Sequence, residues 1–230
     1  MSGFYDATVD GLRRIYDRRL SGPPVLDLNA DFPSANRFVE RWSALRDEAL
    51  GLAQDINRIP RFHELMPAQA EISANDARDW RMHVVRAYGV TLRRNMARCP
   101  ELASILARTP EVLSATLSFL APHKHIPCHR GPFRGILRFQ LGLSVPLDAD
   151  GRPAAVLKLH DTEQRIGDGQ CLLWDDTFPH EVWNHSDEPR IALLLDVRRP
   201  HMPWDLALLS RLIVAAVGTS IRLGAVPQTG

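Results

Sequence analysis

Two histidines stand beside strand-like stretches and are candidates for binding a metal ion. His129 lies in a turn between Pro127 and Pro132, just before an apolar run, and His180 follows the turn 175–179 at the start of another run. In antiparallel β-sandwiches, imidazoles at strand edges assemble metal sites, usually as two histidines and one carboxylate. Turn histidines are also common, so the spacing alone leaves both interpretations open.

Two arginines stand in strand-like runs that are otherwise poor in charge. Alternation along residues 136–146 places Arg138 and Gln140 on one face and an apolar row on the other. In the run 190–197, Arg190 likewise begins the less apolar face. A buried guanidinium without a partner is costly, so each arginine needs an anion. Two of them in one barrel suit a dicarboxylate; for either one alone, a surface ion pair at the rim is the alternative.

Strand-like runs fill the second half of the chain, with no helical pattern between them. From Glu111 onward, Gly, Pro, Asp and Asn separate six such runs: VLSATLSFL, GILRFQLGLSVPL, AAVLKLH, CLLWD, HEVWN and RIALLLDV. This series predicts an antiparallel sandwich or jelly roll rather than alternating strands and helices. The expected fold class is α+β, mainly β: a double-stranded β-helix, that is, a cupin-like jelly roll.

The first 110 residues show mainly helical patterns. Apolar positions from Phe38 to Ile56 recur in steps of four and three, which predicts one long helix with Ser34 as its N-cap. Residues 80–88 predict a strand, and Pro100 fits the first turn of another helix. We expect these helices to pack on one sheet of the jelly roll. A single domain, 1–230, would then comprise a helical part, a jelly-roll core and a C-terminal helix with a tail, at 1–110, 111–200 and 201–230.

The composition is that of an ordinary soluble protein. The formal net charge is +1 and the basic residues are scattered, so nucleic acid is not an expected partner. Three cysteines without metal-type spacing, Cys99, Cys128 and Cys171, indicate a reducing compartment. The N-terminus shows no apolar signal segment, and the uncharged run 212–221 is too short to span a bilayer. We therefore expect a cytoplasmic protein without a transmembrane segment; no pattern fixes its oligomeric state.

Two stretches together carry a resemblance to a known family. HIPCHRGPFRGILRFQLGL and DDTFPHEVWNHSDEPRIALLLDVRRP resemble the aspartyl/asparaginyl β-hydroxylases, iron(II)- and 2-oxoglutarate-dependent dioxygenases whose relatives include lipid A acyl-chain hydroxylases. The similarity runs from about residue 80 to residue 200 and needs no gap between residues 118 and 143. It implies Fe(II) as the metal, with 2-oxoglutarate and dioxygen as cosubstrates.

The resemblance implies roles for five residues. His129, in HRGP, and His180, in DDTFPHEVW, would be the iron ligands. Arg190, ten positions after His180, and Ser118, eleven before His129, would bind the distal carboxylate of 2-oxoglutarate. Arg138, in LRFQLGL, would meet the carboxylate nearer the metal.

Two positions depart from the patterns of the relatives. The lipid A hydroxylase branch has an acidic residue two positions after its first histidine ligand, where this chain has Gly131, which cannot ligate. The aspartyl/asparaginyl branch also has glycine there, so the resemblance implies two histidines with water in the vacant place. Gln140 stands where that branch has a histidine, and it can still donate a hydrogen bond to the cosubstrate. Asp175 and Asp176 precede a turn and are expected to cap it.

These features favour an enzyme that hydroxylates an unactivated C–H bond. The first expectation is the β-carbon of an Asp- or Asn-like residue or small molecule. A lipid acyl-chain hydroxylase at the cytoplasmic membrane face is the alternative, because the tail LLSRLIVAAVGTSIRLG can lie on a membrane; a packing or dimerisation helix is the other interpretation of that tail. From another class, a jelly-roll protein could bind metal without turnover. His123 and His125 are expected at the pocket rim or on the substrate side.

Overall fold

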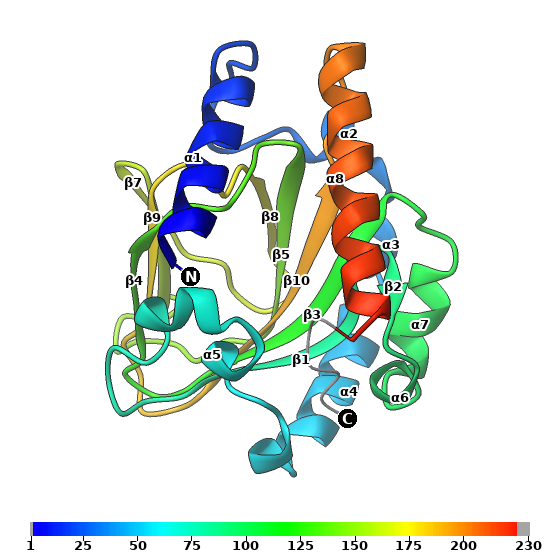
Figure 1. The fold of residues 1–230 in the computed structure, drawn as a ribbon. Helices are drawn as coiled ribbons and strands as arrows, with labels where there is room; N and C mark the ends of the chain where they lie inside the picture. The colour runs from blue at the N-terminus through cyan, green and yellow to red at the C-terminus, as the bar shows by residue number, and fades with distance from the viewer. Residues whose placement is uncertain (1, 225–230) are drawn as a thin grey trace.

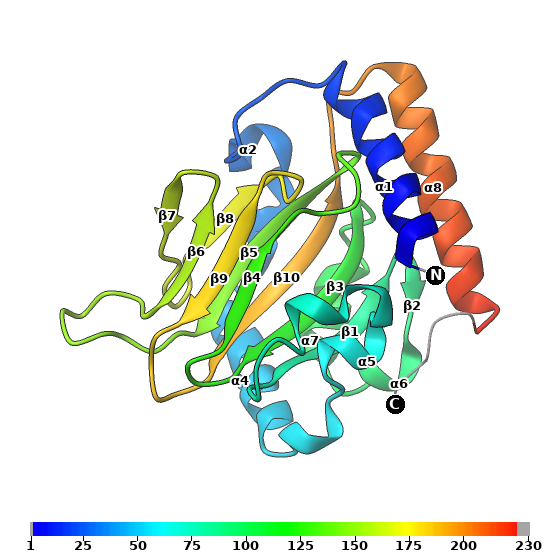
Figure 2. The same cartoon turned by 60° about the vertical axis from the view of Figure 1, so that its left-hand side comes forward.

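Two antiparallel sheets stack against each other in the computed structural model, which describes residues 2–224, with the backbone alone for residues 2–6 (Figures 1 and 2). The larger sheet has the strand order β2-β1-β3-β10-β5-β8, and the smaller has the order β4-β9-β6-β7. The expected mainly-β jelly roll is confirmed. The strands are β1 (Trp80–Ala87), β2 (Val90–Thr91), β3 (Val112–Leu120), β4 (His125–His129), β5 (Ile136–Ser144), β6 (Ala155–Leu159), β7 (Thr162–Gln164), β8 (Cys171–Trp174), β9 (His180–Asn184) and β10 (Arg190–Arg198).

All six strand-like runs of the sequence are strands, namely β3, β5, β6, β8, β9 and β10. The placement of His129 in a turn was wrong, because it is the last residue of β4. This strand is short, contains Pro127 and forms one edge of the smaller sheet. Proline has no N–H to donate, so it is tolerated at such an edge, and it hides the strand from a pattern-based prediction.

The outer face of the larger sheet is apolar and covered by helices. Leu137, Phe139 and Leu141 of β5 alternate with inward residues and pack against Phe38, Leu45 and other buried helical side chains. The packing of the N-terminal helices on one sheet is thereby confirmed. The covering elements are α2 (Leu28–Asp31), η1 (Pro33–Ala35), α3 (Asn36–Val39), α4 (Trp42–Ala53), η2 (Ile56–Arg58), α6 (Arg93–Met96) and α7 (Pro100–Leu106).

The single long helix expected over residues 34–56 is wrong, because the chain breaks there into η1, α3 and α4. Ser34 lies inside η1 and is not an N-cap. At the break, Arg41 leaves helical geometry, with φ −108° and ψ 14°, and its guanidinium pairs with both carboxylate oxygens of Glu101 on α7. The apolar spacing continues across the break because η1, α3 and α4 all pack on the same face of the sheet.

Two long helices, α1 (Ser2–Asp17) and α8 (Trp204–Arg222), stand together beside the sandwich (Figure 2). The buried Tyr16 hydroxyl shares a 2.7 Å hydrogen bond with Ser210 of α8, and Arg19 forms an ion pair with Asp205. By length and composition alone, α8 is apolar enough to cross a membrane. The expected C-terminal helix is confirmed, while the tail 225–230 lies outside the described residues.

Candidate active site

His129 and His180 face each other on the neighbouring strands β4 and β9. They are register partners, and their ring centroids are 4.1 Å apart. Each Nδ1 lies within hydrogen-bonding distance of the carbonyl oxygen two residues earlier, at 2.8 Å from Pro127 and 2.9 Å from Phe178. A carbonyl only accepts, so each Nδ1 donates its proton and each Nε2 keeps a free lone pair. Both rings are therefore in the tautomer that binds a metal through Nε2.

Both imidazoles are neutral at physiological pH. Burial lowers the pKa of His129, and burial together with the neighbouring His129 ring lowers the pKa of His180 to about 3. A divalent ion binds neutral imidazole, so no proton has to leave either ring first. Within residues 2–224 no group of three or more His, Cys, Asp or Glu side chains is arranged to hold a metal, so the donor set on offer is this pair.

Asp176 fills the space beside the pair that a side chain at position 131 would occupy. A Cβ atom on Gly131 would lie 2.1 Å from Asp176 Oδ1, and the Gly131 N–H donates to the Asp176 carbonyl at 2.6 Å. The carboxyl group is buried, which raises the pKa of Asp176 to about 6, and Oδ1 has no hydrogen-bond partner in the described part of the chain. The expectation that Asp176 caps the turn is wrong; its carboxylate instead adjoins the glycine of HRGP.

Asp175 does cap the turn, as expected. Its Oδ1 accepts hydrogen bonds from the backbone N–H of Thr177 at 3.1 Å and from the Thr177 hydroxyl at 2.6 Å. Its Oδ2 pairs with Arg134, at 2.7 Å from Nε, and with Arg199. The two adjacent aspartates therefore have different roles. Asp175 fixes the loop between β8 and β9, and Asp176 points into the site.

Arg138 projects from β5 toward the same end of the site and already has two partners. Its Nε lies 2.8 Å from Asp196 of β10, and Nη2 lies 3.1 Å from Asp176. Burial opposes the charge, but the two carboxylates outweigh it and raise the pKa of Arg138. Contact of Arg138 with the nearer carboxylate of 2-oxoglutarate stays a prediction; in this structure the arginine orients Asp176.

Arg190 begins β10 and is buried without a partner. The residue is 5 % exposed, and its Nε and Nη1 atoms have no hydrogen-bond partner within residues 2–224. Burial lowers the pKa of Arg190 to about 10, which still leaves the guanidinium charged at neutral pH. An unpaired charge in an apolar interior is costly, so this position fits an anion that supplies the missing partner.

Gln140 and Ser118 lie near Arg190 on the inner face of the larger sheet. Gln140 and Arg190 line one small cavity together with Leu157 and Val182 of the smaller sheet. Ser118 is buried on β3 opposite Ala192, and its Oγ accepts a 3.0 Å hydrogen bond from Trp80 Nε1. This bond leaves the hydroxyl hydrogen of Ser118 to donate elsewhere. The four expected anion-side residues therefore share one face, although Arg138 is satisfied and Arg190 is not.

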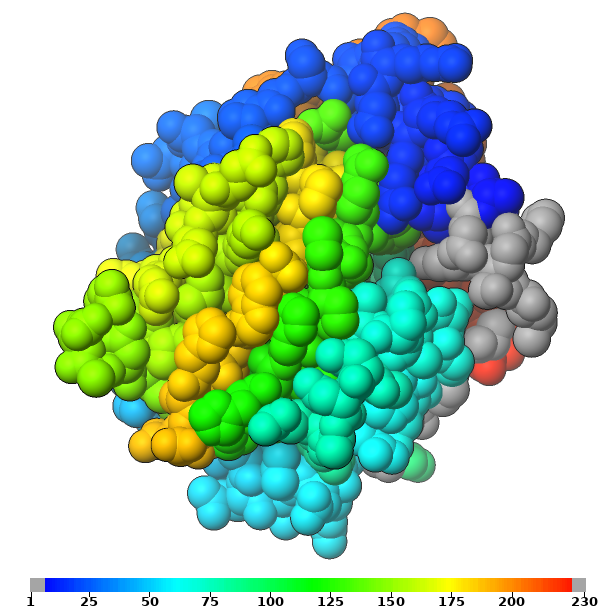
Figure 3. All heavy atoms as spheres, turned by 90° about the vertical axis from the view of Figure 1, so that its left-hand side faces the viewer, coloured from blue at the N-terminus to red at the C-terminus, as the bar shows by residue number. Residues whose placement is uncertain are grey.

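A second cavity, of about 310 Å³, reaches His129 from outside between α1, β4 and η3 (Pro67–Ile72). Figure 3 shows this side of the molecule, where α1 in blue, β4 in green and η3 in cyan meet. Arg13 of α1 lines the mouth and donates to the carbonyl oxygens of Arg130 and Gly131 at 2.8 and 3.0 Å. Sequence reasoning missed Arg13, since nothing local marks a helix residue that contacts a loop more than 100 positions away.

His123 and His125 lie away from the mouth, so their placement at its rim was wrong. His123 Nε2 lies 2.8 Å from Asp187 at an exposed turn. His125 stacks on Trp183, with ring centroids 4.8 Å apart, on the outer face of the smaller sheet. Strand alternation explains this, because His125 and Trp183 are register partners whose side chains point away from the interior.

A family model for aspartyl/asparaginyl β-hydroxylases matches residues 39–200, a range that contains both histidines, Asp176 and all the anion-side residues. The chain belongs to this family. The 162 matched residues of 230 cover the jelly roll and the helical layer from α4 onward, but not α1, α2, η1 or α8.

Two relatives illustrate the range of the β-hydroxylase family. An ornithine lipid ester-linked acyl 2-hydroxylase from Rhizobium tropici is 32% identical over 182 residues, which are 79% of this chain and 63% of that protein. Human aspartyl/asparaginyl β-hydroxylase is 25% identical over 169 residues, 70% of this chain and 20% of that protein. The chain thus spans less than two thirds of the length of either relative. A solved prolyl-4-hydroxylase from Pseudomonas putida has a TM-score of 0.44 and 14% identity, over 70% of this chain and 87% of that one.

Proposed function

We propose that this β-hydroxylase-family protein is an Fe(II)- and 2-oxoglutarate-dependent dioxygenase that hydroxylates an unactivated C–H bond. The observation that carries the proposal is Arg190, a buried guanidinium without a partner on the same barrel interior as two metal-competent histidines. A protein that bound only metal would have no need for this unpaired charge. A dicarboxylate cosubstrate uses both features at once.

The residues present fit both groups. His129 and His180 offer two free Nε2 lone pairs to iron, and the adjoining Asp176 places negative charge beside a dication. Arg190 would take the distal carboxylate of 2-oxoglutarate, which supplies the partner that its Nε and Nη1 atoms lack. Bound iron would supply the oxidising chemistry, in which substrate, dioxygen and 2-oxoglutarate give hydroxylated substrate, succinate and carbon dioxide.

The other residues position these groups and exclude water. Arg138 keeps the Asp176 carboxylate oriented through its 3.1 Å ion pair. Ser118 and Gln140 have donors left for the cosubstrate, and Leu157 and Val182 form the apolar wall of the cavity that holds Arg190. A dry wall strengthens each ionic contact inside the site and keeps water from the reacting groups.

We further propose a lipid acyl chain as the substrate. The support is the ornithine lipid ester-linked acyl 2-hydroxylase, which is 32% identical over most of this chain. An Asp- or Asn-like residue, the first expectation from sequence, is the second candidate, and it is supported by the 25% identity to human aspartyl/asparaginyl β-hydroxylase.

The test is substrate-dependent succinate formation by the purified chain with Fe(II), 2-oxoglutarate and air. We expect succinate in proportion to hydroxylated product with an ester-linked acyl lipid, and little with an Asp-containing peptide. The reverse preference would favour the second candidate. Without oxygen, Fe(II) and 2-oxoglutarate should together give a weak visible absorption band. No band and no succinate with any substrate would contradict the dioxygenase proposal.

A further inference from the structure

The solvent side of α8 carries a row of large apolar side chains. Trp204 is 80 % exposed, Leu208 49 %, Leu212 59 % and Leu223 82 %, and Ile15 of the neighbouring α1 is 47 % exposed. The first three follow one another in steps of four, so they form a single stripe on the helix. We call Trp204, Leu208 and Leu212 the α8 stripe. A contiguous apolar stripe on one helix marks a binding surface more often than scattered apolar residues do.

The opposite side of α8 is packed against the protein. Leu206, Ser210 and Ile221 are buried there, and Ser210 bonds to Tyr16 of α1. At Gly218 a Cβ atom would lie 2.8 Å from the Tyr88 carbonyl oxygen, so the helix touches the chain closely. A helix fixed along one side is not surrounded by lipid, so α8 as packed here has the form of a helix that lies on a membrane surface.

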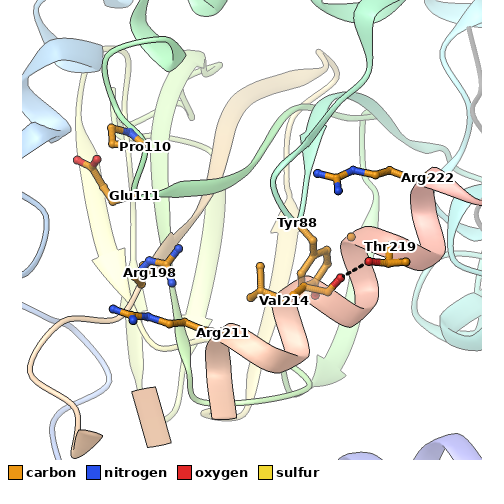
Figure 4. A pocket seen from close by; sticks show the side chains of 10 residues that line it. Tyr88, Pro110, Glu111, Arg198, Arg211, Val214, Thr219 and Arg222 are labelled. Atoms are coloured by element: carbon orange, nitrogen blue, oxygen red, sulfur yellow. Dashed lines mark hydrogen bonds between the residues drawn. The ribbon is translucent and has the colours of Figure 1, made fainter. Parts of the chain in front are cut away.

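A groove of about 660 Å³ runs along the edge of the α8 stripe, between α8, the turn after β1 and the start of β3. Three arginines line it, Arg198, Arg211 and Arg222, and Glu111 is its one acidic residue. In Figure 4, Arg198 and Arg211 lie side by side, and Arg222 lies beyond Tyr88. Within residues 2–224, none of the three arginines forms an ion pair.

We propose that the α8 stripe and this arginine groove dock the protein on an anionic membrane, with the headgroup of a negatively charged phospholipid in the groove. At 100° per residue, Arg211 and Arg222 lie within about 60° of Leu208 around the helix axis, so apolar and cationic groups face the same plane. An apolar face beside arginines, with an exposed tryptophan at one end, is the pattern of helices that lie in the membrane interface.

The charge of this surface favours a membrane, rather than a second copy of the chain, as its binding partner. The exposed side of α8 has no free acidic residue, since Asp205 is paired with Arg19. A second copy would bring the same three arginines and only one groove carboxylate, Glu111, to meet them. An anionic lipid surface supplies both the apolar layer for the α8 stripe and the negative charge for the groove.

The helix α1 connects the proposed docking surface on α8 with the mouth of the candidate active site. The helix α1 contacts α8 through Tyr16, and it also lines the mouth that leads to His129 through Arg13. The same helix thus packs against α8 and borders the mouth of the site. The inference rests on the proposed function only in its choice of a lipid substrate; the docking itself requires neither metal nor turnover.

Co-sedimentation with vesicles tests the proposal. We expect the full chain to sediment with equimolar phosphatidylcholine and phosphatidylglycerol vesicles and to stay in solution with phosphatidylcholine alone. The double variant Leu208→Glu/Leu212→Glu should lower the partition coefficient by about tenfold or more, because two leucines that docking would bury in the membrane are lost. Arg211→Gln and Arg222→Gln should each lower it about fivefold. Leu147→Glu and Arg58→Gln, which change exposed residues elsewhere, are the matched controls and should bind as wild type.

Two further measurements keep the outcome decisive. Blue-shifted fluorescence on addition of vesicles should be present in the wild type and reduced in Trp204→Phe. Wild type that stays in solution with anionic vesicles would overturn the proposal, as would binding of inorganic phosphate without vesicle binding, or equal vesicle binding by the stripe variants. A dimer that Leu212→Glu dissociates, with vesicle binding unchanged, would assign the stripe to self-association instead. The His129→Ala variant should still bind vesicles, so failure of docking and failure of catalysis are distinguishable.

Discussion

The two ends of the inner face of the larger sheet hold the same residue type in opposite states. At the metal end, Arg138 lies between the carboxylates of Asp176 and Asp196. At the far end, Arg190 has two nitrogen atoms without a partner in the described part of the chain. Both arginines point into one barrel, so the difference lies in what the protein itself provides. The fold itself pairs the charge of Arg138, whereas only a ligand can pair the charge of Arg190.

The contrast distinguishes an arginine that stabilises the fold, Arg138, from an arginine that is available to bind a ligand, Arg190. A buried ion pair with good geometry holds its side chains in place, and the loss of one partner leaves a buried charge exposed to an apolar interior. A buried charge without a partner lowers stability until an anion binds, and binding then recovers that cost. Variants at the two ends should therefore differ in kind, with stability changed at one end and cosubstrate affinity at the other.

The largest effect is expected at the histidine pair. His180→Ala removes one of two free Nε2 donors, and we expect succinate formation to fall below detection, because a single imidazole does not hold the ion. The control is His185→Ala, an exposed histidine that follows the same strand, which should keep wild-type turnover. Full activity in His180→Ala would show that the ligand assignment is wrong.

Arg138→Met should cost the most stability. It leaves Asp176 and Asp196 without their shared cation, for which a buried pair predicts a loss of about 3–5 kcal/mol, toward the lower end because the Arg138 side chain is 24% exposed. Urea unfolding of the metal-free chain measures this free energy. An unchanged transition midpoint would remove the distinction between the two ends.

Arg190→Met should act in the opposite way. The free energy of unfolding of the ligand-free chain should change little or rise, because the variant removes an unpaired buried charge. The KM for 2-oxoglutarate should rise about 100-fold, the scale expected when one partner of a buried charge pair is truncated. Initial rates across a range of 2-oxoglutarate concentrations give the KM. A large loss of stability with unchanged KM would reverse the roles given to the two arginines.

The smallest effect is expected at Gly131. In Gly131→Ala the new methyl group would overlap the Asp176 carboxylate, which predicts a loss of about 1–3 kcal/mol and a drop in turnover. In the double variant Gly131→Ala/Asp176→Gly the two losses should be less than additive, because the methyl group has no carboxylate to overlap once Asp176 is removed. Gly51→Ala in α4, where nothing lies within 4 Å of the added atom, is the control and should gain up to about 1 kcal/mol. Additive losses in the double variant would show that the two positions do not interact.

Local pattern was sufficient for much of the fold. The alternation along β5 and β10 predicted which side chains face the barrel, because a strand that packs helices on one side must present its apolar residues there. Local pattern did not predict the helix break at Arg41. The break is accompanied by an ion pair with Glu101 on another helix, and the apolar spacing continues across it. The edge strand β4 was not predicted, because Pro127 interrupts its strand pattern.

The candidate site was predictable in its residue types and not in its pairings. His129, His180 and Arg190 could be named from the two motif stretches, but the state of each arginine depends on carboxylates from other strands. Asp176 approaches Gly131 across 45 positions of sequence. The one available signal was Gly131, which stands where the resemblance places an acidic ligand in the lipid A hydroxylase branch. A glycine there indicates that another group needs the space of its side chain, but it does not indicate which group.

The candidate site draws its groups from both sheets. The histidines belong to the smaller sheet and Arg190 to the larger, so a diacid bound at both ends would link one sheet to the other. Binding would then stabilise the stacking of the two sheets as well as the site, and it should raise the free energy of unfolding of the whole sandwich.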